Sequence, residues 1–169
     1  MNEVQLIRAQ LSLERQHAAE VVRLLADGSK LLAVEAFRQA AVDYLAWILS
    51  RFEERDQLFH DLLRKRFATE DPTRRAVEAA LALPGSSREA LTKLETALGG
   101  ANVGAWSDFL RFFSGAWSTR RDEIDRLFER QAKVTDWRTV SGIDADSIVD
   151  ERARYAGVKA TLPADMSYT

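Results

Sequence analysis

The sequence predicts an all-α protein, an antiparallel helical bundle with about three long helices and several shorter ones. Helix-forming residues such as Ala, Leu, Arg and Glu dominate the chain. Only 3 prolines and 8 glycines occur in 169 residues, and most of them separate periodic apolar segments. No run of alternating β-branched residues indicates a strand. Short connections between long helices favour antiparallel neighbours.

Two long helices are expected first, over about residues 3–26 and about residues 30–67. The first ends at Asp27-Gly28, and the second ends in a cationic turn that suits the negative end of the helix dipole. Apolar residues of the second helix form one narrow stripe that we expect to face the core. The stripe consists of Val34, Phe37, Ala41, Leu45, Ile48, Phe52, Phe59 and Leu63.

Arg55 falls inside this stripe. A guanidinium at such a position has four possible explanations. It forms an internal ion pair, the helix leaves the core there, the position belongs to an interface, or the side chain extends to solvent at the end of the bundle. His60, by contrast, lies about 110° from the stripe centre, beside Glu53 and Asp56, so we expect a solvated flank there.

The later elements follow from capping and breaking residues. Asp71-Pro72 predicts a helix to about residue 83, and Ser86 with Glu89 forms a capping box that opens a helix ending at 99–100. A long helix is expected over about residues 105–133 with a kink at 114–115, then a turn over 136–142. Asp144 caps a last helix through Tyr155. We expect one domain over residues 1–158 and an extended tail over 159–169.

Bulk properties exclude several classes of protein. The net charge of −2 provides no basic field for nucleic acid, and the absence of cysteine excludes disulfides and thiolate metal sites. The charged amino terminus is typical of neither a signal peptide nor a membrane anchor. No stretch approaches the ~20 apolar residues that span a bilayer. We therefore expect a cytoplasmic protein that binds neither nucleic acid nor membranes.

The first helix is apolar on two opposite sides. One stripe contains Val4, Ile7, Leu11, Ala18, Val22 and Leu25, and the second contains Leu6, Leu13, His17, Leu24 and, in continuation, Leu31. A helix apolar on two sides is covered on two sides, either inside the domain or by a partner. With aromatic residues in the carboxy-terminal part, the second stripe predicts a protein interface. The interface candidates are Leu6, Leu13, His17, Leu24, Trp137 and Tyr155.

A metal site is the alternative. The Glu14-x-x-His17 spacing resembles the motif of ferritin-like di-iron carboxylate proteins, which implies a ligand set of Glu14, His17, Glu53 and His60. His17 with Glu53-Glu54 before Leu58-Phe59 also resembles hemerythrin-type bundles. The chain departs from both families because the second Glu-x-x-His motif is missing and only two histidines occur.

Known catalytic motifs do not occur. The sequence lacks a Gly-x-Ser-x-Gly elbow, a Walker loop and a dinucleotide-binding fingerprint. Adjacent carboxylates such as Asp122-Glu123 and Asp150-Glu151 are expected to be solvated, since neighbours on a helix diverge by about 100°. The sequence therefore favours a non-catalytic accessory protein without a cofactor, which acts as a homo-oligomer or as a small subunit of a larger assembly.

Overall fold

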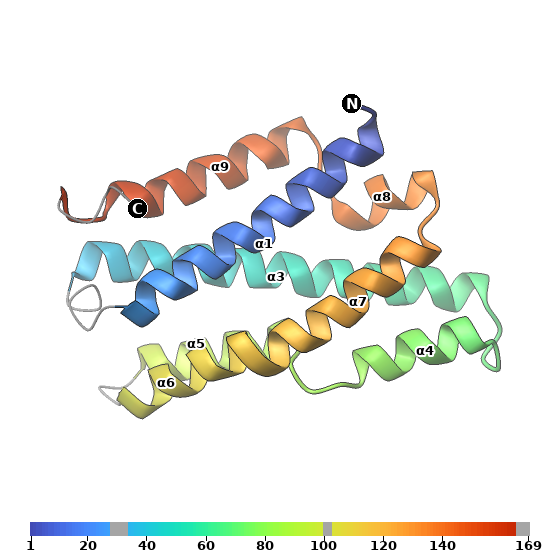
Figure 1. Cartoon of the computed structure of the whole chain (residues 1–169), viewed down its shortest axis with the longest axis horizontal. Helices are drawn as coiled ribbons and strands as arrows, with labels where there is room; N and C mark the ends of the chain where they lie inside the picture. The colour runs from blue at the N-terminus through green and yellow to red at the C-terminus, as the bar shows by residue number, and fades with distance from the viewer. Residues whose placement is uncertain (28–33, 100–102, 165–169) are drawn as a thin grey trace. The chain divides into compact units, whose positions relative to one another are not determined.

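The computed structural model describes residues 1–27, 34–99 and 103–164, and this part of the chain is helical without any strand (Figure 1). The all-α prediction is therefore confirmed for the described residues. Among them, no helix is both long and apolar enough to cross a membrane. The arrangement of about three long antiparallel helices is not confirmed.

Contacts divide the chain into two compact units. The first unit contains Met1–Ile48 and Ser141–Thr169, and the second contains Leu49–Val140. The single domain expected over residues 1–158 stays a prediction, as does the extended tail. The last helix already includes Lys159 and Ala160, and residues 165–169 lie outside the described part.

The first unit is built from α1 (Glu3–Asp27), the beginning of α3 (Glu35–Arg66) and α9 (Ala145–Ala160). Helices α1 and α9 run in the same direction, because Gln10 contacts Glu151 whereas Glu20 contacts Lys159 (Figure 1). The first apolar stripe of α1 supplies core residues to this unit, among them Ile7, Ala18, Val22 and Leu25.

The second unit contains the rest of α3 and the helices that follow it. These are α4 (Pro72–Leu81), α5 (Ser87–Leu98), α6 (Val103–Phe112), the π-helix η1 (Phe113–Trp117), α7 (Ser118–Gln131) and most of α8 (Val134–Ser141). The predicted caps are confirmed at Asp71, which accepts from the Thr73 N–H, and at Ser86, which accepts from the Glu89 N–H. Each satisfies a backbone donor that the first helical turn leaves without an internal partner.

The predicted kink at Ser114-Gly115 is a π-helical segment within a continuous run from α6 to α7. The turn before α5 approaches it closely. Gly85 has φ +109°, and a Cβ at this position would lie 2.2 Å from the carbonyl oxygen of Ala116. Ser87 then accepts a hydrogen bond from the Trp117 indole at 3.0 Å. Glycine is therefore required both for its backbone conformation and for this close approach.

Two sequence predictions have a clear outcome here, and a third falls partly outside the described residues. The core stripe of α3 is confirmed, since its members from Phe37 to Leu63 are buried. The start of α3 at residue 35 differs from the expected residue 30, but positions 28–33 lie outside the described residues. The turn expected over residues 136–142 is wrong, because α8 occupies Val134–Ser141. The first turn of α8 is stabilised by the Asp136 carboxylate, which accepts a hydrogen bond from the Lys133 N–H at 2.7 Å.

Candidate functional site

A buried carboxylate joins the three helices of the first unit. Glu151 of α9 is 0% exposed. Its Oε1 accepts from the Tyr44 hydroxyl of α3 at 2.9 Å and lies 2.5 Å from His17 Nδ1 of α1. Its Oε2 accepts from the Gln10 amide at 3.3 Å. One side chain of α9 is therefore hydrogen-bonded to both neighbouring helices, which satisfies the requirement that a buried charged group be bonded.

The hydrogen-bond network continues along α1 on either side of this carboxylate. Gln10 also donates to Glu14, a second fully buried carboxylate, at 3.4 Å. The His17 ring stacks on Tyr155 of α9, with centroids 3.7 Å apart and planes 4° from parallel. We call Gln10, Glu14, His17, Tyr44, Glu151 and Tyr155 the polar clamp.

A second carboxylate continues the contact toward the end of α9. Glu20 accepts from the Tyr155 hydroxyl at 2.6 Å and from Lys159 at 2.7 Å. These two hydrogen bonds hold the pKa of Glu20 below its ordinary value, the bond from Lys159 contributing most. Glu20 therefore stays charged and fixes the orientation of Tyr155, whose ring stacks on His17.

Burial sets the protonation of both tyrosines. It raises the pKa of Tyr44 far above its ordinary value, and the charge of Glu151 raises it further. The pKa of Tyr155 is also raised, first by burial and then by the hydrogen bond to Glu20. Both phenols thus remain hydrogen-bond donors at physiological pH. The arrangement is suited to holding helices together through fixed donors and acceptors.

Apolar burial contributes little to the position of α9. Its buried side chains are Glu151 and Val158, whereas Ile148 and Tyr155 of the same row are half-buried. Arg154 instead lies over the Trp47 ring, 4.6 Å from its centroid. Helix α9 is therefore held mainly by polar and aromatic contacts.

The four ligands of the metal alternative are divided between the two units. Glu14 and His17 belong to the polar clamp of the first unit. In the second unit, Glu53 accepts from the Arg88 N–H at 3.3 Å, and His60 Nε2 lies 3.9 Å from Glu78. Over residues 1–27, 34–99 and 103–164 there is no group of three or more His, Asp or Glu side chains suited to a metal ion.

The six interface candidates have very different exposure. Leu6 is 47% exposed and Leu13 is half-buried, but Leu24 is only 4% exposed. His17 and Tyr155 contact each other, as described above. Trp137 belongs to the second unit, where it is buried in an edge-to-face contact with Phe128, with ring centroids 4.7 Å apart. These positions therefore do not form one exposed surface.

A buried ion pair lies in the second unit. Arg121 donates to Asp56 at 2.7 Å and to Asp125 at 2.9 Å, and Arg120 lies 3.8 Å from Asp56. Burial alone lowers the pKa of Arg121, but the two carboxylates outweigh it and hold the pKa above its ordinary value. Arg55 is also buried, with its guanidinium 5.7 Å from the centroid of the Phe52 ring. The expectation of a solvated flank is wrong for Asp56, because Arg121 pairs with it inside the unit.

Sequence reasoning missed the central residue of the clamp. Glu151 was expected to be solvated and is fully buried, so that prediction is wrong. A signal was present, because Ile148, Glu151, Tyr155 and Val158 follow helical spacing and place the carboxylate inside an apolar row. Tyr44 and Gln10 gave no comparable signal.

Comparisons of this chain with protein-family models, with curated proteins and with solved structures found no match.

Proposed function

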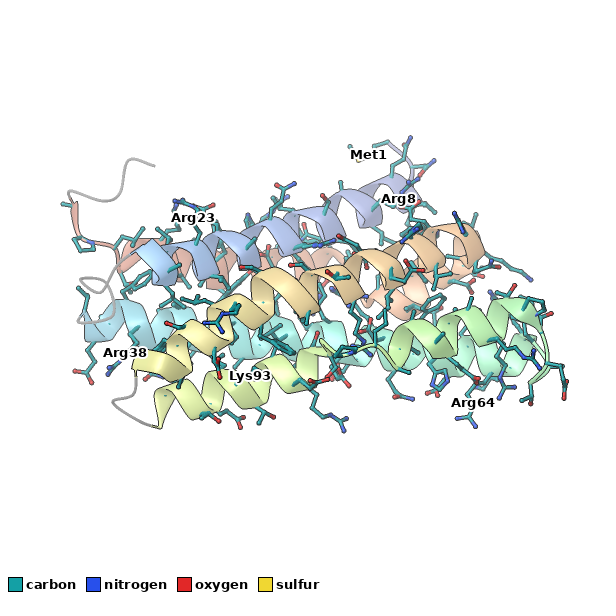
Figure 2. All side chains as sticks on the ribbon, turned by 60° about the horizontal axis from the view of Figure 1, so that its bottom comes forward. Met1, Arg8, Arg23, Arg38, Arg64 and Lys93 are labelled. Carbon is teal, nitrogen blue, oxygen red and sulfur yellow. The ribbon has the colours of Figure 1, made fainter. Side chains whose placement is uncertain are left out.

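We propose that this chain is a non-catalytic helical protein that acts by association, either as a homo-oligomer or as a small subunit of a larger assembly. One observation carries the proposal. The large apolar side chains that the described part of the first unit exposes are Met1, Leu6 and Val149. All three lie where α1 and α9 begin, and Figure 2 labels Met1 at this end of α1. We call these three residues the apolar end.

The parallel course of α1 and α9 explains this grouping. Gln10 meets Glu151, Leu6 lies one turn before Gln10, and Val149 lies within the turn before Glu151. Scattered exposed leucines are ordinary, but apolar residues that gather at one end of a unit are typical of an association surface. Each square ångström of apolar area removed from water stabilises a complex by about 25 cal/mol before the cost of association.

The test compares two leucines of similar exposure. Leu6 is 47% exposed and Leu98 of the second unit is 42% exposed, so Leu98→Glu is a matched control for Leu6→Glu. We expect Leu6→Glu to shift the native mass measured by light scattering toward that of a single chain, with helical circular dichroism retained. Leu98→Glu should leave the mass unchanged. An unchanged mass for Leu6→Glu would reject the apolar end as the association surface.

The heteromeric form of the proposal has its own test. The native mass of the complex recovered from the protein's own cells distinguishes a self-assembly from a subunit of a larger assembly. A single-chain mass both in the cells and for the purified protein at all concentrations would contradict both forms.

Other expectations remain hypotheses alongside this proposal. The small number of residues that separate α1 from α3 in the sequence supports an antiparallel bundle of about three long helices, in which α1 and α9 are parallel neighbours. The metal alternative is tested by elemental analysis of protein purified without a chelator. Less than about a tenth of an equivalent of iron, manganese or zinc would exclude its carboxylate and imidazole site. The cytoplasmic location and the absence of nucleic-acid and membrane binding also stay predictions.

A further inference from the structure

We infer that α9 is an exchangeable helix, and that in the associated protein α9 of one copy occupies the polar clamp of a second copy. The inference rests on the proposed self-association and names its partner and its contact. Helix α9 belongs to the first unit, yet the chain reaches it only after passing through the entire second unit, Leu49–Val140. Exchange of such an element between identical chains preserves every contact that it makes.

The α9 helix carries its own stabilising contacts. Asp144 and Ser147 form a reciprocal capping box, and Arg154 pairs with Asp150 at 3.1 Å within the helix. These local contacts do not depend on which copy holds α9. The connection to α8 contains Gly142, which is exposed and has φ +63°, with open space around a Cβ position. A glycine at this point allows the chain direction to change without steric cost.

Helix α9 contributes few buried apolar side chains of its own. Val158 is the buried apolar side chain of this helix. Its other contacts are the hydrogen bonds of the polar clamp and of Glu20, the stacking of Tyr155 on His17, and the contact of Arg154 with the Trp47 ring. Polar groups regain hydrogen bonds with water when the helices separate, so the net cost per bond is modest. The groups of the polar clamp on α1 and α3 regain all of their protein partners only when an α9 helix returns. Opening is therefore less costly than separation of an apolar interface, and reclosing is selective.

The chemistry of the vacated site favours a second copy as its occupant. The site presents His17, Tyr44 and Gln10 to one carboxylate, and Glu20 to one phenol and one ammonium group. A matching helix needs these three groups four residues apart, as in Glu151, Tyr155 and Lys159 of α9 itself.

The experiment uses the absence of cysteine from the native chain. Glu20→Cys and Lys159→Cys replace two partly exposed side chains whose charged atoms lie 2.7 Å apart, and they leave the Glu151 contacts intact. The two single variants are co-expressed and treated with a short bis-maleimide reagent. Exchange places the new thiol at position 20 of one copy beside the new thiol at position 159 of the other. We expect a covalent product of twice the single-chain mass on denaturing gels, at least tenfold more abundant than with either variant alone.

A matched pair in the second unit serves as the control. Glu53→Cys with Arg88→Cys also replaces an ion pair, 3.8 Å apart, between two helices that do not exchange. This double variant should cross-link within one chain, whereas Glu20→Cys with Lys159→Cys in one chain should give the product of double mass.

The outcomes separate the exchange from the proposed self-association. A double variant at positions 20 and 159 that cross-links only within one chain, in a protein whose native mass exceeds one chain, overturns the exchange and leaves association through the apolar end intact. A native mass of one chain, with the same intramolecular product, overturns both. A product of double mass from the co-expressed single variants supports the exchange.

Discussion

Each unit of this protein buries a carboxylate between helices, but the partners and the surroundings differ. In the second unit Asp56 is paired with the guanidinium of Arg121, and α7 also buries Ile124, Leu127 and Phe128. In the first unit Glu151 is bonded by a phenol, an amide and a histidine, and α9 adds only Val158 as a buried apolar side chain. A buried acid can thus be embedded in an apolar core, or can itself be the main attachment of a helix.

Aromatic packing accounts for much of this difference. In the second unit Trp117 stacks on Phe113 with ring centroids 4.4 Å apart and also contacts Phe52 at 5.5 Å. Phe128 makes edge-to-face contacts with Phe59 and Trp137. Such pairs contribute about 0.5–1.5 kcal/mol each beyond the area they bury. Loss of the buried acid should therefore affect the units differently: in the second it leaves a charge inside a packed core, and in the first it releases a helix.

The largest effect is expected for Asp56→Ala in the second unit. The substitution leaves Arg121 and Arg120 buried with one fewer carboxylate, and breaking a buried pair in this way costs about 3–5 kcal/mol. The free energy of unfolding, measured by urea titration with circular dichroism, should fall by about that amount. Asp125→Ala is the control, because this second partner of Arg121 has a side chain 49% exposed, and exposed pairs contribute about 1 kcal/mol or less. Equal losses would mean that burial adds nothing to the Asp56 pair.

A somewhat smaller and more local effect is expected for Glu151→Ala in the first unit. The change removes the acceptor of Tyr44, Gln10 and His17, and leaving such buried donors without partners costs about 1–3 kcal/mol. Hydrogen exchange should accelerate in residues 145–160 while the amides of α7 keep their protection. Arg152→Ala, at a neighbouring exposed position, should change neither helix. Equal loss of protection in α7 and α9 would show that the clamp supports the whole chain.

The sequence was sufficient for the apolar stripe of α3 and for three helix caps, where the information is local. The apolar stripe of α3 followed from helical spacing, and the caps at Asp71, Ser86 and Asp144 followed from the chemistry of a helix start. The same kind of signal was present but misinterpreted at α8. Asp136 lies three residues after Lys133 and accepts a hydrogen bond from its N–H, which is a pattern typical of a helix start.

The candidate site could not be assembled from the sequence because its partners are distant. Glu151 meets His17 across 134 positions and Tyr44 across 107 positions. Helical spacing showed that α1 is apolar on two sides, but it could not show that α9 would cover part of the second side. It likewise placed Arg55 in the core stripe without revealing that Arg121, from α7, pairs with Asp56 next to it.

Acid should weaken an ion pair in each unit. The pKa of Glu20 is lowered mainly by Lys159, and the pKa of Asp136 mainly by the paired hydrogen bonds from Arg66, both at 2.5 Å. A folded pKa below the unfolded value gives stability that is present above the unfolded pKa and is lost as pH falls through the folded pKa. The loss should therefore begin near the ordinary values of 4.5 for Glu20 and 3.8 for Asp136 and continue below them.

Two variants show how much each unit contributes to this loss of stability in acid. Thermal unfolding midpoints, followed by circular dichroism between about pH 6 and pH 3, should fall less for Asp136→Asn than for the parent chain. Lys159→Met should reduce the fall by a smaller amount, because the Glu20 and Lys159 side chains are 29% and 28% exposed and solvent screens their attraction. A parent-like decline in both variants would assign the acid sensitivity to other groups.

The smallest expected effect tests how far α9 depends on its own helix propensity. Gly157 lies inside α9 at an exposed position where a Cβ would meet nothing within 4 Å, so Gly157→Ala should raise the free energy of unfolding by about 0.5–1 kcal/mol. Gly115 also has open space around it, but it lies in η1, whose conformation is fixed by the buried rings of Phe113 and Trp117. Gly115→Ala should therefore gain less than half as much in the same urea titration. An equal gain at both positions would contradict the expected difference between α9 and η1. It would mean that α9, which is held by polar contacts, is no more sensitive to helix propensity than η1, which packs in an aromatic core.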